Sequence, residues 1–434
     1  MKKTLLLIAT LLASYVGMAQ ETYHPTAENL KAREQFQDEK FGIFLHWGLY
    51  SMMGTTEWIM TNRDINYKEY PKLAKTFYPS EFDADAWVKA IKAAGAKYIT
   101  ITTRHHDGFS LFKTDTSTYN SVDGTPFKRD IIKEIADACQ RNGIKLHLYY
   151  SHLDWGREDY PVGRTGTGTG RPKEKANWPS YYTFMNTQLT ELLTNYGKVG
   201  AIWFDGWWDH DSDAKPFDWQ LEEQYAMIHK LQPQCLVANN HHHTPFPGED
   251  IQIFERDLPG ENKAGLSGQS IGRLPLESCQ TINEHWGYNI TDTLYKSPKE
   301  LIQMLVRAAG KNANLLLNIG PEPGGALPEL ALDRLQAIGE WLNQYGETIY
   351  GTRGGIVGPH EWGVSTQRGN KLYIHILNCM DSSLFIPTGN HKIKSATVFG
   401  TNKRVNFTKT GNGITLNFTT IPTDIDYIVE LTLG

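Results

Sequence analysis

Eight short apolar segments recur between residues 41 and 319, and most of them are separated by stretches with helical periodicity. Runs of this kind, without polar relief, are typical of strands buried on both faces of a parallel sheet. Eight such strands alternating with helices predict an α/β chain that folds as a (β/α)8 barrel. The predicted strands span residues 41–48, 97–103, 144–151, 199–204, 235–239, 251–254, 278–283 and 314–319.

The pattern changes after this barrel. From about residue 351 onward, short alternating runs are separated by Gly, Asn and Pro, which is typical of antiparallel strands joined by turns. This pattern predicts an all-β sandwich of about eight strands. We therefore divide the chain into a signal peptide at residues 1–19, a catalytic barrel at 20–348 and a C-terminal β-sandwich at 349–434.

The first 19 residues have the layout of a secretory signal peptide. Lys2 and Lys3 precede an apolar run at about 5–16, and small residues at 17–19 suit cleavage after Ala19. The run is too short to span a bilayer, and no later run is long enough. We expect a periplasmic or secreted protein that does not insert into a membrane.

The charge balance is mildly acidic, with 43 Lys and Arg against 48 Asp and Glu, a net charge of −5. The chain also lacks blocks of basic residues. This composition argues against nucleic acids and anionic membrane surfaces as partners. It leaves the oligomeric state open.

Polar side chains collect where the predicted strands end. In a parallel barrel the loops after the strands form one face, so these side chains meet on one rim. Imidazoles both donate and accept hydrogen bonds, which suits a ligand with several hydroxyl groups. The Gly-rich segment 163–170 predicts a flexible loop beside this rim. The predicted rim residues are His46, His105, His106, Tyr150, His152, Asp205, the 239–243 segment and Glu255.

Asp205 is the most distinctive residue of this rim. It ends the apolar run 199–204 and has Trp203, Trp207 and Trp208 as close neighbours in the sequence. A carboxylate at a strand end can simply cap the next helix. Here the surrounding indoles form a potential apolar wall, and together with the other rim residues they favour a sugar-cleaving site.

A glycosidase site needs a second carboxyl group. Retaining enzymes place the two groups about 5–5.5 Å apart, one as nucleophile and one as general acid and base. Glu255 is the first candidate to partner Asp205, although Arg256 beside it offers a structural ion pair instead. Glu57 and Glu277 are the competing acids, and Glu249 is a weaker candidate.

The paired histidines and the triplet at 241–243 raise the alternative of a metal site. Neighbours on an extended strand point to opposite faces, so His105 and His106 would rarely bind one ion together. The first strand also ends in a single histidine, without the pair that a barrel metallohydrolase needs. We therefore expect no metal and no organic cofactor.

Six motifs of the predicted barrel match a known family. They are Phe-Gly-Ile-Phe-Leu-His-Trp-Gly at 41–48, Thr-Glu-Trp at 56–58, Arg-His-His-Asp-Gly-Phe at 104–109, Ile-Trp-Phe-Asp-Gly at 202–206, Thr-Ile-Asn-Glu-His-Trp-Gly-Tyr-Asn at 281–289 and Asn-Leu-Leu-Leu-Asn-Ile-Gly-Pro at 314–321. Through them the chain resembles glycoside hydrolase family 29, the α-L-fucosidases. The last two motifs favour the broad-specificity branch of that family.

The resemblance implies hydrolysis of terminal α-L-fucosyl residues from fucosylated glycans, with retention, through a covalent fucosyl-enzyme intermediate and without a cofactor. It implies Asp205 as the nucleophile and Glu255 as the acid/base, with Glu277 as the runner-up. The residues that it implies for the fucose pocket are His46, Glu57, Trp58, His105, His106, Tyr150 and Trp203.

The chain departs from the family pattern after the fifth strand. Relatives often have Asn-Asp-Arg where this chain has Asn239, Asn240 and His241, so we expect His241 to replace that Arg or to leave its place unfilled. Two alternative functions stay open. One is a lectin-like protein that keeps the fold without turnover, and the other is a glycosidase for L-galactose or D-arabinose.

Overall fold

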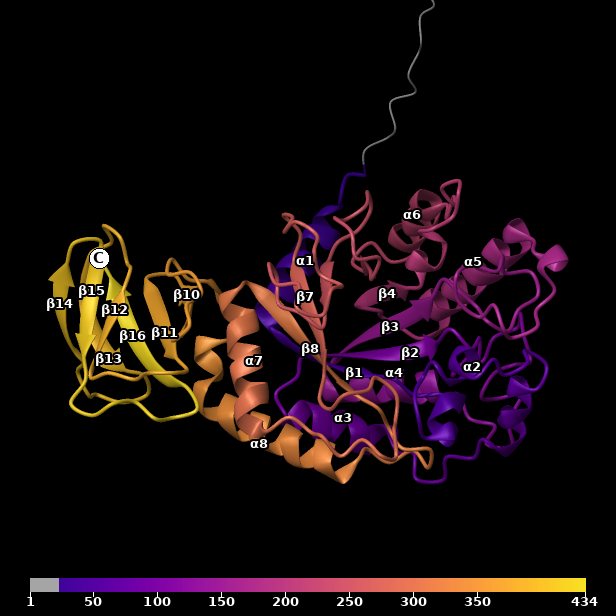
Figure 1. Ribbon diagram of the computed structural model, residues 1–434, viewed down its shortest axis with the longest axis horizontal. Helices are drawn as coiled ribbons and strands as arrows, with labels where there is room; N and C mark the ends of the chain where they lie inside the picture. The colour runs from indigo at the N-terminus through magenta and orange to yellow at the C-terminus, as the bar shows by residue number, and fades with distance from the viewer. Residues whose placement is uncertain (1–22) are drawn as a thin grey trace, which may run out of the picture.

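The computed structural model describes residues 23–434, which form a parallel barrel followed by antiparallel sheets (Figure 1). The predicted signal peptide at 1–19 lies outside the described residues. Within residues 23–434, no helix is both long enough and apolar enough to cross a membrane.

The barrel confirms the predicted fold class. Its strands are β1 (Phe41–Leu45), β2 (Tyr98–Arg104), β3 (Lys145–Ser151), β4 (Ala201–Asp205), β5 (Leu236–Asn239), β6 (Gln252–Glu255), β7 (Leu276–Thr281) and β8 (Ala313–Ile319). They pair in parallel in the order β5-β4-β3-β2-β1-β8-β7-β6. The outer strands β5 and β6 meet through a parallel bridge between Ala238 and Ile251, so the barrel is nearly closed.

Helices lie on the outside of the barrel and at the end where its strands begin, where Phe36 of the first helix packs with the inner side chains. They are α1 (Ala27–Glu39), α2 (Ile59–Asn62), α3 (Ala84–Ala93), α4 (Ile131–Asn142), α5 (Trp178–Asn195), α6 (Leu221–Leu231), α7 (Pro298–Gly310) and α8 (Glu329–Tyr345). Helix α1 was not expected from the sequence, because only Asn29 and Phe36 are buried and the apolar periodicity is therefore weak. The Thr26 hydroxyl caps it by accepting from the Asn29 backbone N–H at 3.1 Å.

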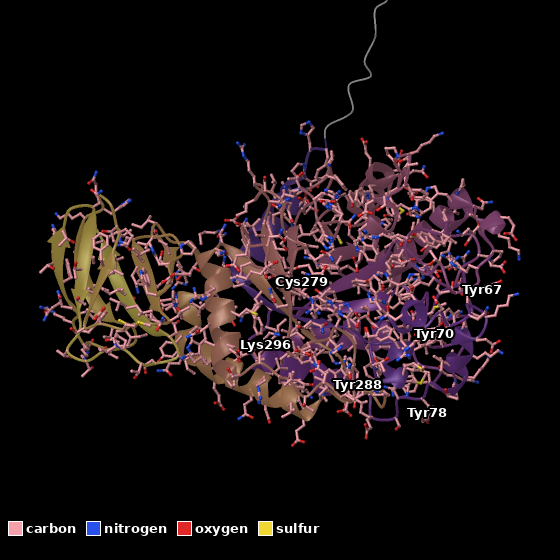
Figure 2. The ribbon with its side chains drawn as sticks, viewed as in Figure 1. Tyr67, Tyr70, Tyr78, Cys279, Tyr288 and Lys296 are labelled. Carbon is pink, nitrogen blue, oxygen red and sulfur yellow. The ribbon has the colours of Figure 1, made fainter. Side chains whose placement is uncertain are left out.

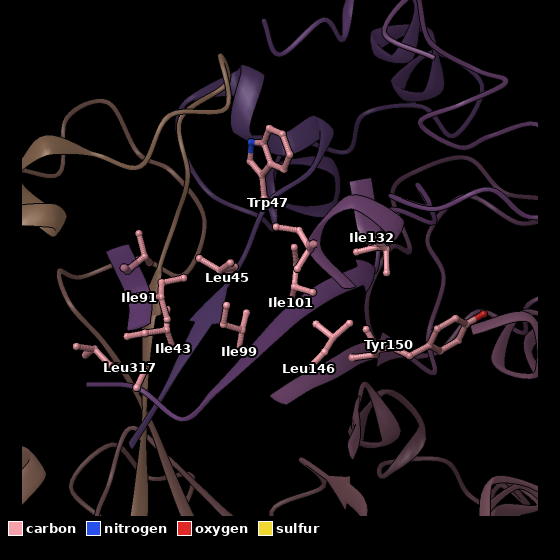
Figure 3. Packing of buried hydrophobic residues seen from close by; sticks show 14 of the residues in the cluster. Ile43, Leu45, Trp47, Ile91, Ile99, Ile101, Ile132, Leu146, Tyr150 and Leu317 are labelled. Atoms are coloured by element: carbon pink, nitrogen blue, oxygen red, sulfur yellow. The ribbon is translucent and has the colours of Figure 1, made fainter. Parts of the chain in front are cut away.

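The strands alternate between two cores. Side chains such as Ile43, Ile99 and Leu317 face the helices and belong to the large outer core (Figure 3). Phe44 and Tyr98 belong to a separate cluster with the inner side chains of the other strands. Successive side chains on a strand point to opposite faces. Of two neighbouring residues, one therefore faces the helices and the other faces the barrel interior.

The C-terminal region confirms the predicted β-sandwich. Its strands are β9 (Arg353–Gly354), β10 (Gly363–Arg368), β11 (Lys371–Ile376), β12 (Ser383–Ile386), β13 (Ile393–Val398), β14 (Asn406–Thr410), β15 (Gly413–Asn417) and β16 (Tyr427–Leu433). They form a five-stranded and a three-stranded antiparallel sheet. Figure 1 shows α7 and α8 between these sheets and the barrel. The Gln303 amide on α7 donates to the carbonyls of Leu377 and Ile425, which ties the two parts together.

A buried ion pair fixes the chain at the rim of β2. The Arg104 guanidinium donates to Asp154, and neither side chain is exposed to solvent. Asp154 also accepts the backbone N–H groups of Gly156 and Arg157. Arg104 immediately precedes His105, so this pair orients a segment that carries rim residues.

We expect the substitution Asp154→Ala to lower the free energy of unfolding by about 3–5 kcal/mol, because it leaves the buried Arg104 charge without its partner. Denaturant unfolding measures the loss. The exposed pair between Glu69 and Lys72 provides the control, since Glu69→Ala should cost less than about 1 kcal/mol. Equal losses for the two variants would contradict this assignment.

Candidate active site

A pocket of about 200 Å³ opens at the carboxyl ends of the barrel strands. Drug-sized ligands usually need about 300–1,000 Å³, so this pocket suits a smaller ligand such as one sugar unit. Most of the residues predicted for the site line it. They are His46, Glu57, Trp58, His105, Trp203, Asp205 and Glu255.

Asp205 ends β4 and receives several hydrogen bonds. Its Oδ1 atom accepts the backbone N–H of Gly206 at 2.9 Å and the indole N–H of Trp208 at 3.0 Å. Its Oδ2 atom accepts the Tyr149 hydroxyl at 3.1 Å and lies 3.5 Å from Nε2 of His106. Gly206 has a φ of +94°, which lets the chain turn directly after the carboxylate.

Glu255 ends β6 and lies close to Asp205. Its Oε2 atom accepts the side-chain N–H of Asn240 at 2.8 Å and lies 2.9 Å from Nε2 of His242. The same Asn240 nitrogen is 3.4 Å from Oδ1 of Asp205. One amide therefore spans both carboxylates and holds them side by side.

The two carboxyl groups have different proton affinities. Burial and the neighbouring charge of Glu255 raise the pKa of Asp205 to about 6. Burial acts to raise the pKa of Glu255 as well, but the hydrogen bonds from His242 and Asn240 outweigh it and hold that pKa below its usual value. This order is opposite to the one that an ionised nucleophile at Asp205 and a protonated acid at Glu255 would need, so the shifts alone do not assign these two roles.

The inner histidines are neutral rings. Burial lowers the pKa of His46 to about 4 and takes the pKa values of His105 and His106 well below their usual range. His46 Nδ1 lies 2.7 Å from Oδ1 of Asn318. Among the described residues, Nδ1 of His105 has no hydrogen-bond partner. Such rings offer donors and acceptors to sugar hydroxyl groups without adding charge.

Indole rings form the apolar part of the pocket. Trp58 stacks on Trp208, with ring centroids 5.4 Å apart and 17° between the planes. Trp286 lies 5.4 Å from the His46 ring, and Trp203 donates its indole N–H to Glu277. These rings provide an apolar surface beside the two carboxylates.

The structure corrects the prediction for Tyr150. Its hydroxyl donates to Gln188 at 2.7 Å, and the side chain extends from β3 into the outer core (Figure 3). Tyr149 is the residue that reaches Asp205. The prediction chose the wrong one of two successive residues, whose side chains point to opposite faces of the strand. Tyr149 pairs with Trp203 in the β3–β4 register, and both side chains face the barrel interior.

The structure also corrects His241. Its Nε2 atom lies 3.0 Å from Glu249, and its ring packs on Phe246, outside the pocket. His242 lines the pocket instead. Its backbone φ of +64° lies in the left-handed region and turns the chain at this point. No pattern in the sequence predicted this conformation.

The rim residue His152 also lies elsewhere than predicted. Its Nε2 atom is 2.7 Å from Gln224, and its ring stacks on Phe204 in the helix-facing layer.

The segment 163–170, predicted to be flexible, is held in place by several hydrogen bonds. Thr165 donates to Asp209 from both its backbone and its hydroxyl.

The competing acids lie at different depths. Glu277 is fully buried under the pocket, where it accepts the hydroxyl of Tyr98 at 2.6 Å and the indole of Trp203 at 2.9 Å, and burial raises its pKa to about 7. Glu57 lines the pocket and accepts the backbone N–H of Gly287 at 3.0 Å. The described hydrogen bonds of both acids go to other residues, whereas the Asn240 amide contacts Asp205 and Glu255 directly.

Several pocket residues escaped the sequence analysis. Cys279, labelled in Figure 2, is opposite Glu255 in the β6–β7 register, so strand parity was the signal that could have found it. The others lie on β1 or in loops and gave no comparable signal. They are Phe44, Arg164, Leu266 and Trp286. Asn240 and His242 also line the pocket, and the sequence analysis placed them on the rim only as part of the 239–243 segment. Within residues 23–434, no three His, Cys, Asp or Glu side chains are grouped in a way that could hold a metal ion.

Paired carboxylates on the open face of a parallel barrel, lined by aromatic rings, define a glycoside hydrolase. Comparison with known proteins narrows this class. The sequence model of the family described as "Alpha-L-fucosidase" matches residues 10–347, and the chain belongs to this family.

Curated relatives include the putative α-L-fucosidase of Caenorhabditis elegans, 30% identical over 78% of this chain and 71% of the relative, and the plasma α-L-fucosidase of Homo sapiens, 30% identical over 81% and 78%. Among solved structures, isoenzyme 1 of Paenibacillus thiaminolyticus is 35% identical, with a TM-score of 0.83 over 94% of this chain and 100% of that one. A Bacteroides thetaiotaomicron α-L-fucosidase, trapped as a covalent intermediate with 2-fluoro-fucosyl fluoride, is 27% identical, with a TM-score of 0.81 over 95% and 98%.

We predict opposite outcomes for two adjacent tyrosines. Tyr149→Phe removes a donor to Asp205 and should lower kcat/KM about 10- to 100-fold, since a hydrogen bond to a charged group contributes about 1.5–3 kcal/mol. Tyr150→Phe should leave kcat/KM unchanged and lower stability by about 1–3 kcal/mol, because Gln188 loses its donor. Kinetics on an aryl α-L-fucoside together with denaturant unfolding separate the two. The reverse pattern would overturn the placement.

Burial of Asp205 should cost stability at neutral pH. Its folded-state pKa of about 6 is above its ordinary value of 3.8, so the ionised form destabilises the fold increasingly from pH 4 to 6 and fully above that range. We expect Asp205→Asn to be more stable than the wild type at pH 7 by up to about 3 kcal/mol and to lose this advantage by pH 4. Denaturation midpoints across this pH range test the sign.

Proposed function

We propose that the protein is a retaining α-L-fucosidase that releases terminal α-L-fucosyl residues from glycans by double displacement. The single observation that supports this best is the Asn240 amide, which spans Asp205 and Glu255. The amide nitrogen lies 2.8 Å from Oε2 of Glu255 and 3.4 Å from Oδ1 of Asp205. These two oxygens can therefore be no farther apart than the sum of the two distances. This favours the spacing of about 5–5.5 Å in retaining enzymes over the about 6.5–9.5 Å of inverting ones.

In the first step, an oxygen of ionised Asp205 attacks the anomeric carbon of fucose. The bond from that carbon to the leaving oxygen breaks, and Glu255 delivers a proton to this oxygen. In the second step, Glu255 takes a proton from water, whose oxygen attacks the same carbon and releases Asp205. The sugar leaves with the configuration that it had in the substrate.

The relatives support fucose as the sugar. The Bacteroides enzyme forms a covalent intermediate with a fluorinated fucosyl donor, and this chain shares its fold over almost its whole length. Fucose carries a methyl group where related sugars have a hydroxymethyl group or hydrogen. An apolar wall such as Trp58 and Trp208 favours that methyl group modestly, by about 1–3 kcal/mol. Rates on aryl glycosides of L-galactose and D-arabinose measure this preference.

We expect azide to rescue the variant Glu255→Ala on an aryl α-L-fucoside with a good leaving group. The first step then needs no acid, and azide replaces the water that Glu255 would have activated. Because Asp205 still forms the intermediate, the product should be α-fucosyl azide, which NMR identifies.

The matched controls are Glu57→Ala and Glu277→Ala, which should show no azide rescue because neither residue acts on the water. Rescue of Glu277→Ala but not of Glu255→Ala would exchange the roles of these two acids. A fucose product with inverted configuration from the wild type would refute double displacement altogether.

A further inference from the structure

The contact between His242 and Glu255 is not used by the mechanism above. Nε2 of His242 lies 2.9 Å from Oε2 of Glu255, and the His242 side chain is 21% exposed. Its backbone has a φ of +64°, a conformation that most residues avoid because it crowds the Cβ atom. The flanking histidines face elsewhere, since His241 binds Glu249 and His243 packs on Trp207. The turn therefore presents one imidazole of three to the pocket.

The groups around Glu255 favour its ionised form, although the first step requires Glu255 to deliver a proton. Asn240 donates to the same Oε2 atom that faces His242, and both contacts favour the ionised carboxylate, as does the charge of Arg256. A general acid must hold its proton until the leaving oxygen takes it. Asn240 has no proton to give up, whereas an imidazole beside a carboxylate can carry one.

We propose that His242 and Glu255 form one proton-carrying pair, in which His242 supplies through Glu255 the proton that the leaving group takes. This inference rests on the proposed function, because it assumes Glu255 as the acid/base. In the structure it is therefore His242 that acts in the pocket, whereas the sequence analysis expected His241 there.

The proton balance closes over one turnover. In the first step, the imidazolium of His242 passes its proton to Glu255 as Glu255 passes one to the leaving oxygen, while Asp205 bonds to the sugar. The pair then consists of neutral His242 and ionised Glu255. In the second step, Glu255 takes a proton from water and returns one to His242, while the remaining hydroxide bonds to the sugar and frees Asp205.

The other titratable groups around this pair do not take its place. Burial lowers the pKa of His46 to about 4 and takes that of His105 well below its usual range, so both rings are neutral near pH 7. His242 is nearer to solvent than either ring and can exchange its proton with water. The remaining ionisable or charged groups that line the pocket or flank the pair are Glu57, Arg164, Asp205, His243, Arg256 and Cys279, and burial raises the pKa of the Cys279 thiol well above its usual value.

The test uses His242→Gln, which keeps an N–H donor for Glu255 but carries no exchangeable charge. We compare kcat/KM against pH for two fucosides, one with 2,4-dinitrophenolate, which departs without a proton, and one with 4-methoxyphenolate, which needs it. For the 4-methoxyphenyl substrate, we expect a loss of roughly 10²-fold at pH 7 and a basic limb moved to lower pH. The dinitrophenyl substrate should keep nearly the wild-type value.

Two results would contradict the proposal that His242 and Glu255 form a proton-carrying pair. Either the basic limb for the 4-methoxyphenyl substrate stays at its wild-type position, or both substrates lose the same factor, as a purely structural contact predicts. His243→Gln is the matched control, because that exposed neighbour touches Trp207 and not Glu255. Azide rescue of Glu255→Ala tests the proposed function separately, so a failed His242 prediction alongside successful rescue refutes the pair alone.

Discussion

The site depends on keeping two carboxyl groups together in a buried pocket. Removing a carboxylate from water and placing a second one beside it both disfavour ionisation, and only nearby hydrogen-bond donors offset that cost. Gly206, Trp208 and Tyr149 supply donors to Asp205, and Asn240 supplies one amide to both carboxylates. These donors come from different strands and loops, so they converge only because a closed parallel barrel brings its strand ends onto one rim.

Strand parity decides which side chains can serve this site. Tyr149, Trp203 and Cys279 share the barrel interior, while Tyr150 and Phe204, one position later on their strands, face the helices. The ends of the strands were readable from the sequence because apolar runs stop there, and this sufficed for the fold, Asp205 and Glu255. In β3, however, Leu146 and Leu148 alternate with Lys145 and His147, and this alternation puts Tyr150 on the same face as the leucines. The prediction for Tyr150 overlooked that signal.

Loop residues were beyond sequence reasoning for another physical reason. Which of three consecutive histidines reaches the pocket is set by one backbone angle at His242 and by the anchoring of His241 on Glu249. Likewise, Arg164 reaches the pocket because Thr165 binds Asp209 behind it. Such loop contacts join residues that are 8 and 44 positions apart, and neither periodicity nor composition encodes them.

Burial and the charge of neighbouring Glu255 raise the pKa of Asp205 to about 6, and the His106 ring beside it does not counter that shift. Ser151 Oγ donates to the carbonyl of Leu153 and therefore accepts from Nδ1 of His106. The other nitrogen of this neutral ring, which faces Asp205, then presents a lone pair and not a donor. The His106 ring thus places neither a charge nor a donor beside the carboxylate, which stays basic. A more basic carboxylate is a stronger nucleophile towards carbon, so the same burial that destabilises the ionised form strengthens its attack once the substrate arrives.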